Sequence, residues 1–339
     1  MKNWMLLFIL TVSYYVGFAV PISDPYPKNP NIDALNYRFK IHVSDTSDEI
    51  RCVETIDIQF LAEGITTLRL DLVKASEKLE GKGMHVKTVV SDGKELNYTH
   101  VDDILTIDLP SSSTLNQRAS YTISYNGIPA SGLKIANNKY GDRTFFSDNW
   151  PNKGRNWLAT IDHPYDKAMC EFIVTAPDHY QVVSNGLKVE ESNLGNGERL
   201  THWKQSIPIA TWLYVMGVAE FAVQYVDQFK GKSIETWVYP QDRDAGFYDF
   251  AIPTKSALAF YSDNIGPFSY EKLANIQSNS VSGGMEAASA ILYSDSSVVG
   301  DRNDRWRNVV IHEIAHQWFG NAVTEYDWDD VWLSEGFDT

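Results

Sequence analysis

Residues 301–320 decide the fold of the later half of the chain and read DRNDRWRNVVIHEIAHQWFG. Apolar residues recur in this stretch at every fourth position, which is typical of the buried face of an amphipathic helix. They are Trp306, Val310, Ile314 and Trp318. Asp301 or Asn303 can cap the start of such a helix, and Gly320 can end it. We therefore predict a helix from about Asp301 to Phe319.

Residues 231–300, which precede this helix, contain both strand and helix patterns. A strand is predicted at Ile234–Tyr239, a helix at Ala245–Ile265 and another strand at Leu273–Gln277, and a glycine pair follows at Gly283 and Gly284. Strands that alternate with helices favour an α/β domain. We predict that this domain covers residues 231–339.

The earlier part of the chain shows the period-two alternation of half-buried strands. In the first such run, Tyr37, Phe39 and Ile41 alternate with charged or polar residues. Further runs are Val53–Phe60, Thr67–Leu72, Met84–Val90, Ile104–Leu109, Tyr121–Tyr125, Met169–Thr175, Arg199–Trp203 and Trp212–Val226. Turn residues separate the runs, so we predict an antiparallel β domain over residues 24–230 and a multidomain protein.

Composition excludes several classes of protein. Hydrophobic residues make up 43% of the 339 residues, as in an ordinary globular protein. The net charge of −15 argues against nucleic acid or an anionic membrane surface as the main partner, because both require a basic face. Two cysteines, Cys52 and Cys170, are too few for a disulfide-dense scaffold. Sequence leaves open whether these two pair or stay as free buried thiols.

Residues 1–20 have the pattern of a secretory signal peptide. Lys2 is followed by a mostly apolar, uncharged run, and small residues at Gly17 and Ala19 suit a cleavage site. The alternative is a retained membrane anchor, but the run is short for a span. We expect export to the periplasm or the extracellular space, with no stable membrane span after cleavage.

His312-Glu313-Ile314-Ala315-His316 carries the chemistry. On a helix, residues four apart lie one above the other, so the two imidazoles can converge on one zinc ion. Glu313 points to one side of the metal, where it can accept a proton from water. Chance occurrence and a structural histidine pair are the alternatives.

A third ligand is available in Trp332-Leu333-Ser334-Glu335-Gly336-Phe337. Glu335 follows His316 by nineteen residues, and a turn plus the start of a second helix would bring it back beside the first. The alternative is an acidic residue that favours the helix dipole. Beside the histidine pair we favour ligation, which gives one Zn²⁺ per chain held by His312, His316 and Glu335.

These motifs, with Gln317-Trp318-Phe319-Gly320-Asn321 between them, closely resemble the zinc signature of the aminopeptidase N family of gluzincins, peptidase family M1. Gly283-Gly284-Met285-Glu286-Ala287 is similar to the family's second signature, G-x-M-E-N. Asp162-His163-Pro164 with Lys167 is similar to a D-x-P-x-x-K stretch of its N-terminal domain. The resemblance implies a saddle-like antiparallel β domain followed by the first part of a thermolysin-like α/β domain.

The resemblance also implies a function, zinc-dependent removal of N-terminal residues from peptides. Glu286 would bind the free α-amino group of the substrate, and Glu313 would be the general base. Gly283, Gly284 and Met285 would line the cleft, the glycines leaving room for a peptide backbone; a plain turn is the alternative reading of the pair.

The sequence departs from the family pattern in three places. Ala287 stands where the family has Asn, and Trp150-Pro151 where many members carry an acidic or amide residue that helps to bind the amino terminus. The chain also ends four residues after Glu335, before the family's catalytic Tyr and its helical C-terminal domain. We therefore expect the catalytic domain to be incomplete. A thermolysin-type endopeptidase, an epoxide hydrolase and an exported non-catalytic zinc- or peptide-binding fragment are the competing hypotheses.

Overall fold

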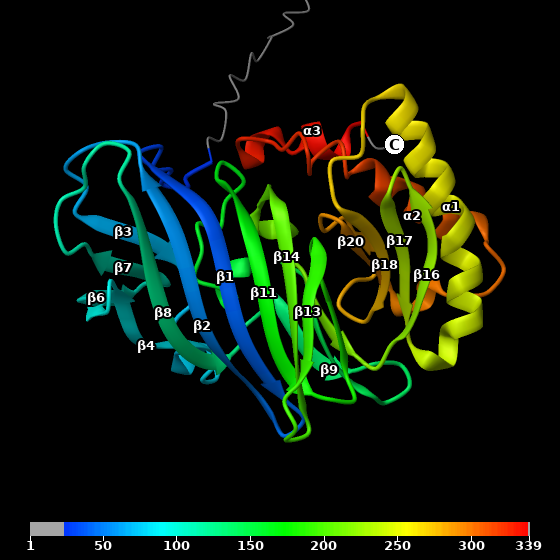
Figure 1. Ribbon diagram of the computed structural model, residues 1–339, viewed down its shortest axis with the longest axis horizontal. Coiled ribbons are helices and arrows are strands. Elements are labelled where there is room, and N and C mark those ends of the chain that lie inside the picture. Colours follow the sequence, from blue (N-terminus) through cyan, green and yellow to red (C-terminus); the bar gives the residue numbers. More distant parts are fainter. Residues whose placement is uncertain (1–23, 338–339) are drawn as a thin grey trace, which may run out of the picture.

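The structure is a computed structural model that describes residues 24–337 (Figure 1). A broad, curved β region occupies the left and centre of the view, and a smaller α/β region with α1 at its outer side lies on the right. The fold class is confirmed: an N-terminal β domain precedes the beginning of an α/β domain. The signal peptide predicted at residues 1–20 lies outside the described residues.

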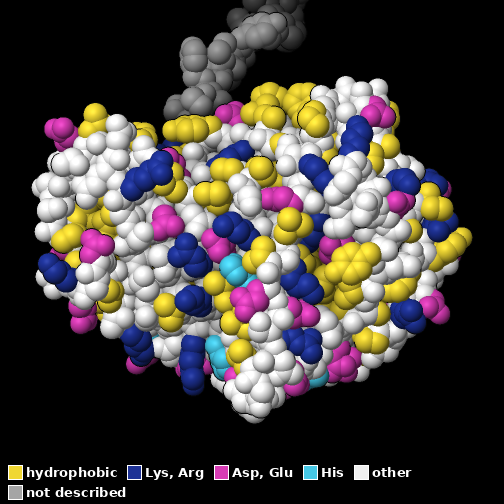
Figure 2. All heavy atoms as spheres, viewed as in Figure 1, with side chains coloured by type: hydrophobic (Ala, Val, Ile, Leu, Met, Phe, Trp, Pro, Cys, Tyr) yellow, Lys and Arg dark blue, Asp and Glu magenta, His cyan; other side chains and the backbone are white. Residues whose placement is uncertain are grey.

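The largest sheet has eight described strands in the order β13-β14-β11-β1-β2-β8-β4-β5. Their bounds are β1 (Ile32–Ser44), β2 (Ser47–Phe60), β4 (Gly83–Ser91), β5 (Lys94–Glu95), β8 (Arg118–Ile128), β11 (Lys167–Pro177), β13 (Leu187–Asn193) and β14 (Glu198–Ala210). Alternation along β1 buries Tyr37, Phe39 and Ile41 on one face, as the sequence predicts. The opposite face carries interspersed acidic and basic side chains (Figure 2). Arg38 and Lys40 alternate with the buried residues of β1 and therefore project from that face.

This sheet departs from the predicted antiparallel pattern at its centre. β1 pairs antiparallel with β2 but parallel with β11, in a register that matches Tyr37 with Cys170. The reason is topological. After β8 the chain leaves the sheet, forms other strands and returns beside β1 only at residue 167, and so long a crossover permits a parallel neighbour.

The cysteine question is settled by this register. Cys52 on β2 is opposite Ile41 of β1, whereas Cys170 on β11 is opposite Tyr37, so β1 lies between the two cysteines. Two strand spacings amount to about 9–10 Å, beyond the reach of a disulfide. Both residues are free and buried, and burial raises the pKa of each thiol.

Two smaller sheets complete the β domain. The first has the order β3-β7-β6 and the second β12-β15-β10-β9. Their bounds are β3 (Thr67–Asp71), β6 (Tyr98–Val101), β7 (Ile104–Asp108), β9 (Leu133–Asn137), β10 (Arg143–Ser147), β12 (Gln181–Ser184) and β15 (Met216–Ala219). Short 3₁₀ turns occupy Glu77–Leu79, Gly154–Asn156, Thr211–Leu213, Pro240–Asp242, Asp295–Ser297 and Trp328–Asp330.

The run of strand predicted at Trp212–Val226 is confirmed only in part, because it is neither continuous nor confined to one sheet. The segment contains the 3₁₀ turn Thr211–Leu213, then β15, then the start of β16 (Ala222–Phe229), which belongs to a different sheet. Trp212, Leu213 and Tyr214 are all buried. A run that is buried on every side has no periodicity to distinguish a strand from a turn.

The α/β domain is built on a sheet with the order β16-β17-β18-β20-β19. Its strands are β16, β17 (Lys232–Val238), β18 (Lys272–Ser278), β19 (Gly284–Met285) and β20 (Ala290–Ser294), and its helices are α1 (Arg243–Asn264), α2 (Asp304–Ala315) and α3 (Trp332–Glu335). β17, β18 and β20 run parallel, and β19 pairs antiparallel with β20 at the edge. β16 pairs with β17, so strand pairing passes to this sheet before the predicted boundary at residue 230.

A buried acid in the β domain gives a prediction about stability. Glu54 on β2 lies fully inside the protein, where Tyr125 and the backbone of Ala159 donate hydrogen bonds to its Oε2. Burial raises the pKa of Glu54 from 4.5 to about 8. The folded state therefore holds a proton that the unfolded state releases above pH 4.5, and stability falls as the pH rises from about 4.5 to 8, by at most about 1.4 kcal/mol per pH unit.

Glu54→Gln is expected to remove this dependence. The free energy of unfolding, measured by chemical denaturation at pH 6 and pH 8.5, should change less with pH in the variant than in the wild type. Glu63→Gln, at an exposed position, is the control and should keep the wild-type slope. Parallel slopes for wild type and Glu54→Gln would contradict the assignment.

Candidate metal centre and catalytic cleft

The helix that carries the histidine pair begins at Asp304, after the second of the two predicted cap residues, and ends earlier than predicted. Asn303 caps α2 by accepting a hydrogen bond from the Trp306 backbone N–H at 3.1 Å. After Ala315 the chain tightens into i→i−3 turns, in which Gln317 N–H bonds to the carbonyl of Ile314, so the predicted end at Phe319 is wrong. Gly320 has φ of 97°, a left-handed conformation that favours glycine, and a Cβ at this position would overlap Ser334 Oγ.

His312, His316 and Glu335 converge. The imidazole centroids lie 4.7 Å apart, and His316 Nε2 is 3.9 Å from Glu335 Oε2. One ligand atom from each of the three residues lies within 4.8 Å of the other two. Two ligands of a tetrahedral zinc ion, each about 2.1 Å from it, would be about 3.4 Å apart, so small side-chain movements would complete the site.

The orientation of His316 suits metal binding. Its Nδ1 is 3.2 Å from the carbonyl oxygen of Phe319 and 3.2 Å from Ser334 Oγ. A carbonyl only accepts, so Nδ1 carries the proton and the lone pair of Nε2 faces the Glu335 carboxylate. Metal-binding histidines are commonly fixed through their other nitrogen in this way. The donor set of two imidazoles and a carboxylate therefore fits zinc.

Glu313, a residue of α2, is buried, and its side chain lies against the edge strand β19. Its carboxylate lies directly over Gly284, where a Cβ would overlap Oε1, Cδ and Cγ of Glu313. Gly283, by contrast, borders open space. The two predicted cleft glycines thus have different surroundings: Gly284 makes room for Glu313, and Gly283 leaves the cleft wall open.

Glu286 follows the edge strand and is held through its backbone. Its carbonyl oxygen accepts hydrogen bonds from Gln317 Nε2 at 3.1 Å and from Asn321 Nδ2 at 2.6 Å. The other end of the Gln317 amide accepts from Ser289 N–H at 2.9 Å. Two residues that follow the histidine pair therefore fix the segment that carries Glu286.

One cleft of about 310 Å³ contains all of these groups. It is lined by the eight residues predicted from sequence, namely Gly283, Gly284, Met285, Glu286, His312, Glu313, His316 and Glu335. The β domain contributes Asp148 and Trp150, which follow β10. Trp150 packs edge-on against Trp212 and Trp328.

The third sequence motif joins the two domains behind this cleft. Asp162 accepts hydrogen bonds from the backbone and side chain of Arg155, which fixes the loop within the β domain. Lys167 extends the other way and donates to the carbonyl oxygens of Asn321 and Ala322, at 3.3 and 3.2 Å. The motif therefore supports the turn that follows the histidine pair.

A buried carboxylate beside the cleft was not found from sequence. The Glu325 side chain is inaccessible to solvent, and burial, reinforced by the charges of Glu286 and Glu335, raises its pKa from 4.5 to about 7. Asp148, Gln317 and Asn321 were also assigned no role from sequence. Asp148 lines the cleft, and Gln317 and Asn321 donate hydrogen bonds to the carbonyl oxygen of Glu286. These contacts join segments that are distant in the sequence, so local spacing could not predict them.

A second group with metal-ligand composition does not fit a metal. It contains Asp24, His163 and Asp327. His163 Nδ1 accepts from the Tyr165 backbone N–H, so the neutral ring carries its proton on Nε2, which lies 2.6 Å from Asp24 Oδ2. Both nitrogens are thereby used, and the group is a hydrogen-bonded contact between the domains.

Two regions of the chain are similar in sequence to one known protein family. The sequence matches the family model described as Peptidase M1 N-terminal domain over residues 33–213 and the Peptidase family M1 domain over residues 251–339. Glutamyl aminopeptidase from Rattus norvegicus is 30% identical over 200 residues, which cover 56% of this chain and 21% of the relative. Probable aminopeptidase 1 from Sulfurisphaera tokodaii is 25% identical over 290 residues, covering 83% of this chain and 36% of that protein.

Solved structures show the same fold. An M1 zinc metallopeptidase from Deinococcus radiodurans superposes with a TM-score of 0.77 at 22% identity, covering 91% of this chain and 68% of that one. The chain spans about a fifth of the length of the glutamyl aminopeptidases that it matches.

Proposed function

This chain belongs to peptidase family M1, and from that premise we propose that its cleft is the active site of a zinc-dependent aminopeptidase. The observation that carries the proposal is a shared cleft. The ligand set His312, His316 and Glu335, the buried Glu313 and the buried Glu286 all line one cavity. We further propose that each chain holds one zinc ion.

The zinc ligands and Glu313 have different roles in the proposed hydrolysis. Zinc bound at the three ligands would supply Lewis acidity, which acidifies water and polarises a carbonyl. Glu313 is placed to accept a proton from the attacking water and to pass it to the leaving amine. Burial of Glu313 and its close packing against Gly284 hold the carboxylate in one orientation.

Glu286 favours an exopeptidase over an endopeptidase. It is a buried carboxylate in the same cleft as the ligand set, and a buried carboxylate is stabilised by a cationic partner. The ammonium group of a free peptide N-terminus is such a partner. A peptide bound through this contact presents its first peptide bond to the ligand set, which gives removal of one N-terminal residue.

The N-terminal sequence indicates where the protein is located. Residues 1–20 have the sequence pattern of a signal peptide, from which we propose export to the periplasm or the extracellular space. Within residues 24–337, none of the helices combines the length and apolarity that a membrane span requires.

The test uses intact protein purified without chelators. We expect about one zinc per chain and hydrolysis of a peptide with a free N-terminus, with the N-acetylated peptide cut at least a hundredfold more slowly. Equal hydrolysis of both peptides would indicate an endopeptidase. Bound zinc without turnover would indicate a binding module, and protein free of zinc would overturn the proposal.

A further inference from the structure

Residues 24–28, which precede β1, are attached to the β domain by aromatic and polar contacts. The ring of Tyr26 stacks on His163 with the centroids 4.4 Å apart, and its hydroxyl donates to Asp71 at 2.5 Å. The Nε2–H of His163 donates to Asp24 Oδ2 at 2.6 Å. Asp71 and His163 are both buried, so these contacts anchor the segment to the interior of the β domain.

The same segment also contacts the α/β domain. Lys28 Nζ donates to Asp327 Oδ2 at 2.7 Å, and the backbone N–H of Asp24 donates to Asp329 Oδ2 at 3.1 Å. The side chains of Lys28 and Asp327 are only 17% and 24% exposed, so solvent screens this ion pair less than a fully exposed one. The segment therefore holds the start of the 3₁₀ turn Trp328–Asp330 against the β domain.

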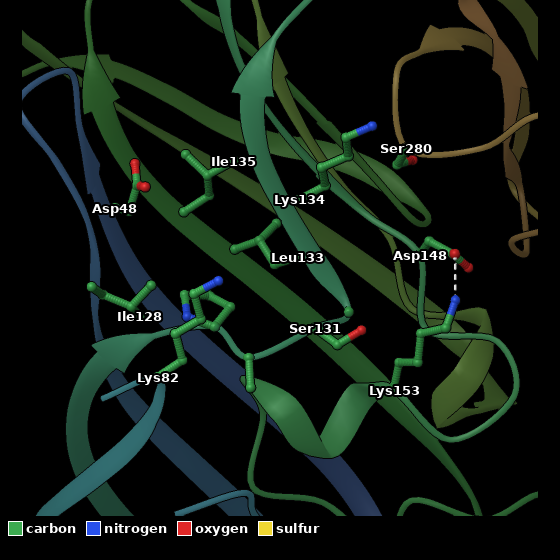
Figure 3. A pocket seen from close by; sticks show the side chains of 13 residues that line it. Asp48, Lys82, Ile128, Ser131, Leu133, Lys134, Ile135, Asp148, Lys153 and Ser280 are labelled. Carbon is green, nitrogen blue, oxygen red and sulfur yellow. Dashed lines mark hydrogen bonds and ion pairs between the residues drawn. The ribbon is translucent and has the colours of Figure 1, made fainter. Parts of the chain in front are cut away.

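A loop of the β domain contacts the same turn. Trp328 Nε1–H donates to Asn152 Oδ1 at 2.9 Å, and the ring of Trp328 packs edge-on against Trp150 of the cleft wall, with the centroids 5.0 Å apart. Within this loop Lys153 pairs with Asp148 at 2.7 Å, the dashed contact in Figure 3, where both residues line a pocket that adjoins the cleft. Two separate parts of the β domain, the N-terminal segment and this loop, therefore hold the turn.

The turn leads to the third zinc ligand through backbone hydrogen bonds. The N–H of Asp330 donates to the carbonyl oxygen of Asp327 at 3.0 Å, and the N–H of Glu335 donates to that of Val331 at 3.1 Å. Val331 both ends the turn and begins α3. A displacement of Asp327 is therefore passed along the backbone to Glu335, whose Oε2 lies 3.9 Å from Nε2 of His316.

We propose that residues 24–28 position the third zinc ligand, and that they act through the ion pair of Lys28 with Asp327. The inference rests on the proposed function, since it takes Glu335 to bind zinc. The two histidine ligands share one helix, so their spacing is set locally, whereas the place of Glu335 is set by the turn before it. Lys28 is not part of the cleft lining, so it is a positioning residue. Its loss should weaken zinc binding because Glu335 is then free to move.

The experiment strips zinc from the intact protein and measures the zinc dissociation constant by competition with a chelating dye. Lys28→Gln should raise this constant about tenfold, the lower end of the effect of residues that orient metal ligands. Asp327→Asn breaks the same pair from the other side and should have the same effect. Because both changes remove one contact, the double variant should stay within about twofold of either single variant. Lys28→Arg keeps the charge and should stay within about twofold of the wild type.

Arg143→Gln is the matched control. It removes an ion pair confined to the β domain, Arg143 with Asp48, and should leave the zinc dissociation constant unchanged. The inference is overturned if Lys28→Gln and Asp327→Asn bind zinc as the wild type does, or if their losses add in the double variant. An equal loss in Arg143→Gln would also overturn it, because the cause would then be general destabilisation. Failure of the proposed function is a separate result, because then the wild type itself would bind no zinc.

Discussion

Glu313→Gln is expected to lower kcat by about 10²–10⁴-fold while zinc stays bound, the range that loss of a general base produces. Glutamine keeps the size of the side chain but cannot accept a proton. The ligand set of His312, His316 and Glu335 is untouched by the change. The measurement is kcat on a free peptide, together with zinc content by elemental analysis of the same preparation.

Two comparisons make this result specific. His316→Ala removes a ligand and should lose zinc and activity together, whereas Glu313→Gln should lose activity alone. Glu63→Gln, at an exposed site on the β domain, should change neither. Activity that survives in Glu313→Gln at more than about a tenth of the wild-type kcat would show that another group accepts the proton.

The sequence pattern predicted strands correctly where one face of the strand is buried and the other is solvated. β1 has one buried and one solvated face, so its alternation was readable, and the strand covers the predicted residues Tyr37–Val43. In Trp212–Val226, the first eight residues, Trp212–Ala219, are all buried, and there the predicted continuous strand is broken by a 3₁₀ turn. The parallel pairing of β1 with β11 depends on the path of the 38 residues between β8 and β11, which no local pattern encodes.

Some residues of the candidate site could likewise be predicted from local spacing, whereas others are placed by distant segments of the chain. His312 and His316 face the same way because they are four apart on one helix, which is a local property. Glu335 was predicted from its distance to His316 and from an expected turn. That turn depends on Gly320, which lies directly against Ser334, and this close approach could not be read from the spacing. The role of Gln317 depends on Glu286 and Ser289, 31 and 28 residues away, and could be seen only in the fold.

Gly284→Ala is the second change with a large expected effect. Gly284 lies on the edge strand β19, and its missing side chain is the space that the Glu313 carboxylate fills. A methyl group there would overlap Glu313 from Cγ to Oε1, so the carboxylate must rotate away from its position. The zinc ligands lie on other segments and should stay in place.

The expected result is a fall in kcat of about a hundredfold, the size of effect that displacing a catalytic group by about 1 Å can produce. Zinc content should match the wild type, and the thermal unfolding midpoint should show that the protein still folds.

Gly283→Ala is the matched control. It places the same methyl group one residue earlier in open space, and its kcat should stay within a few-fold of the wild type if the clash with Glu313 is the cause. Equal losses in the two variants would instead mean that the glycines serve the backbone of the substrate, as the sequence alone suggested. Full activity in Gly284→Ala would mean that Glu313 works from another position, so this pair of variants tests the placement of the base separately from its chemistry.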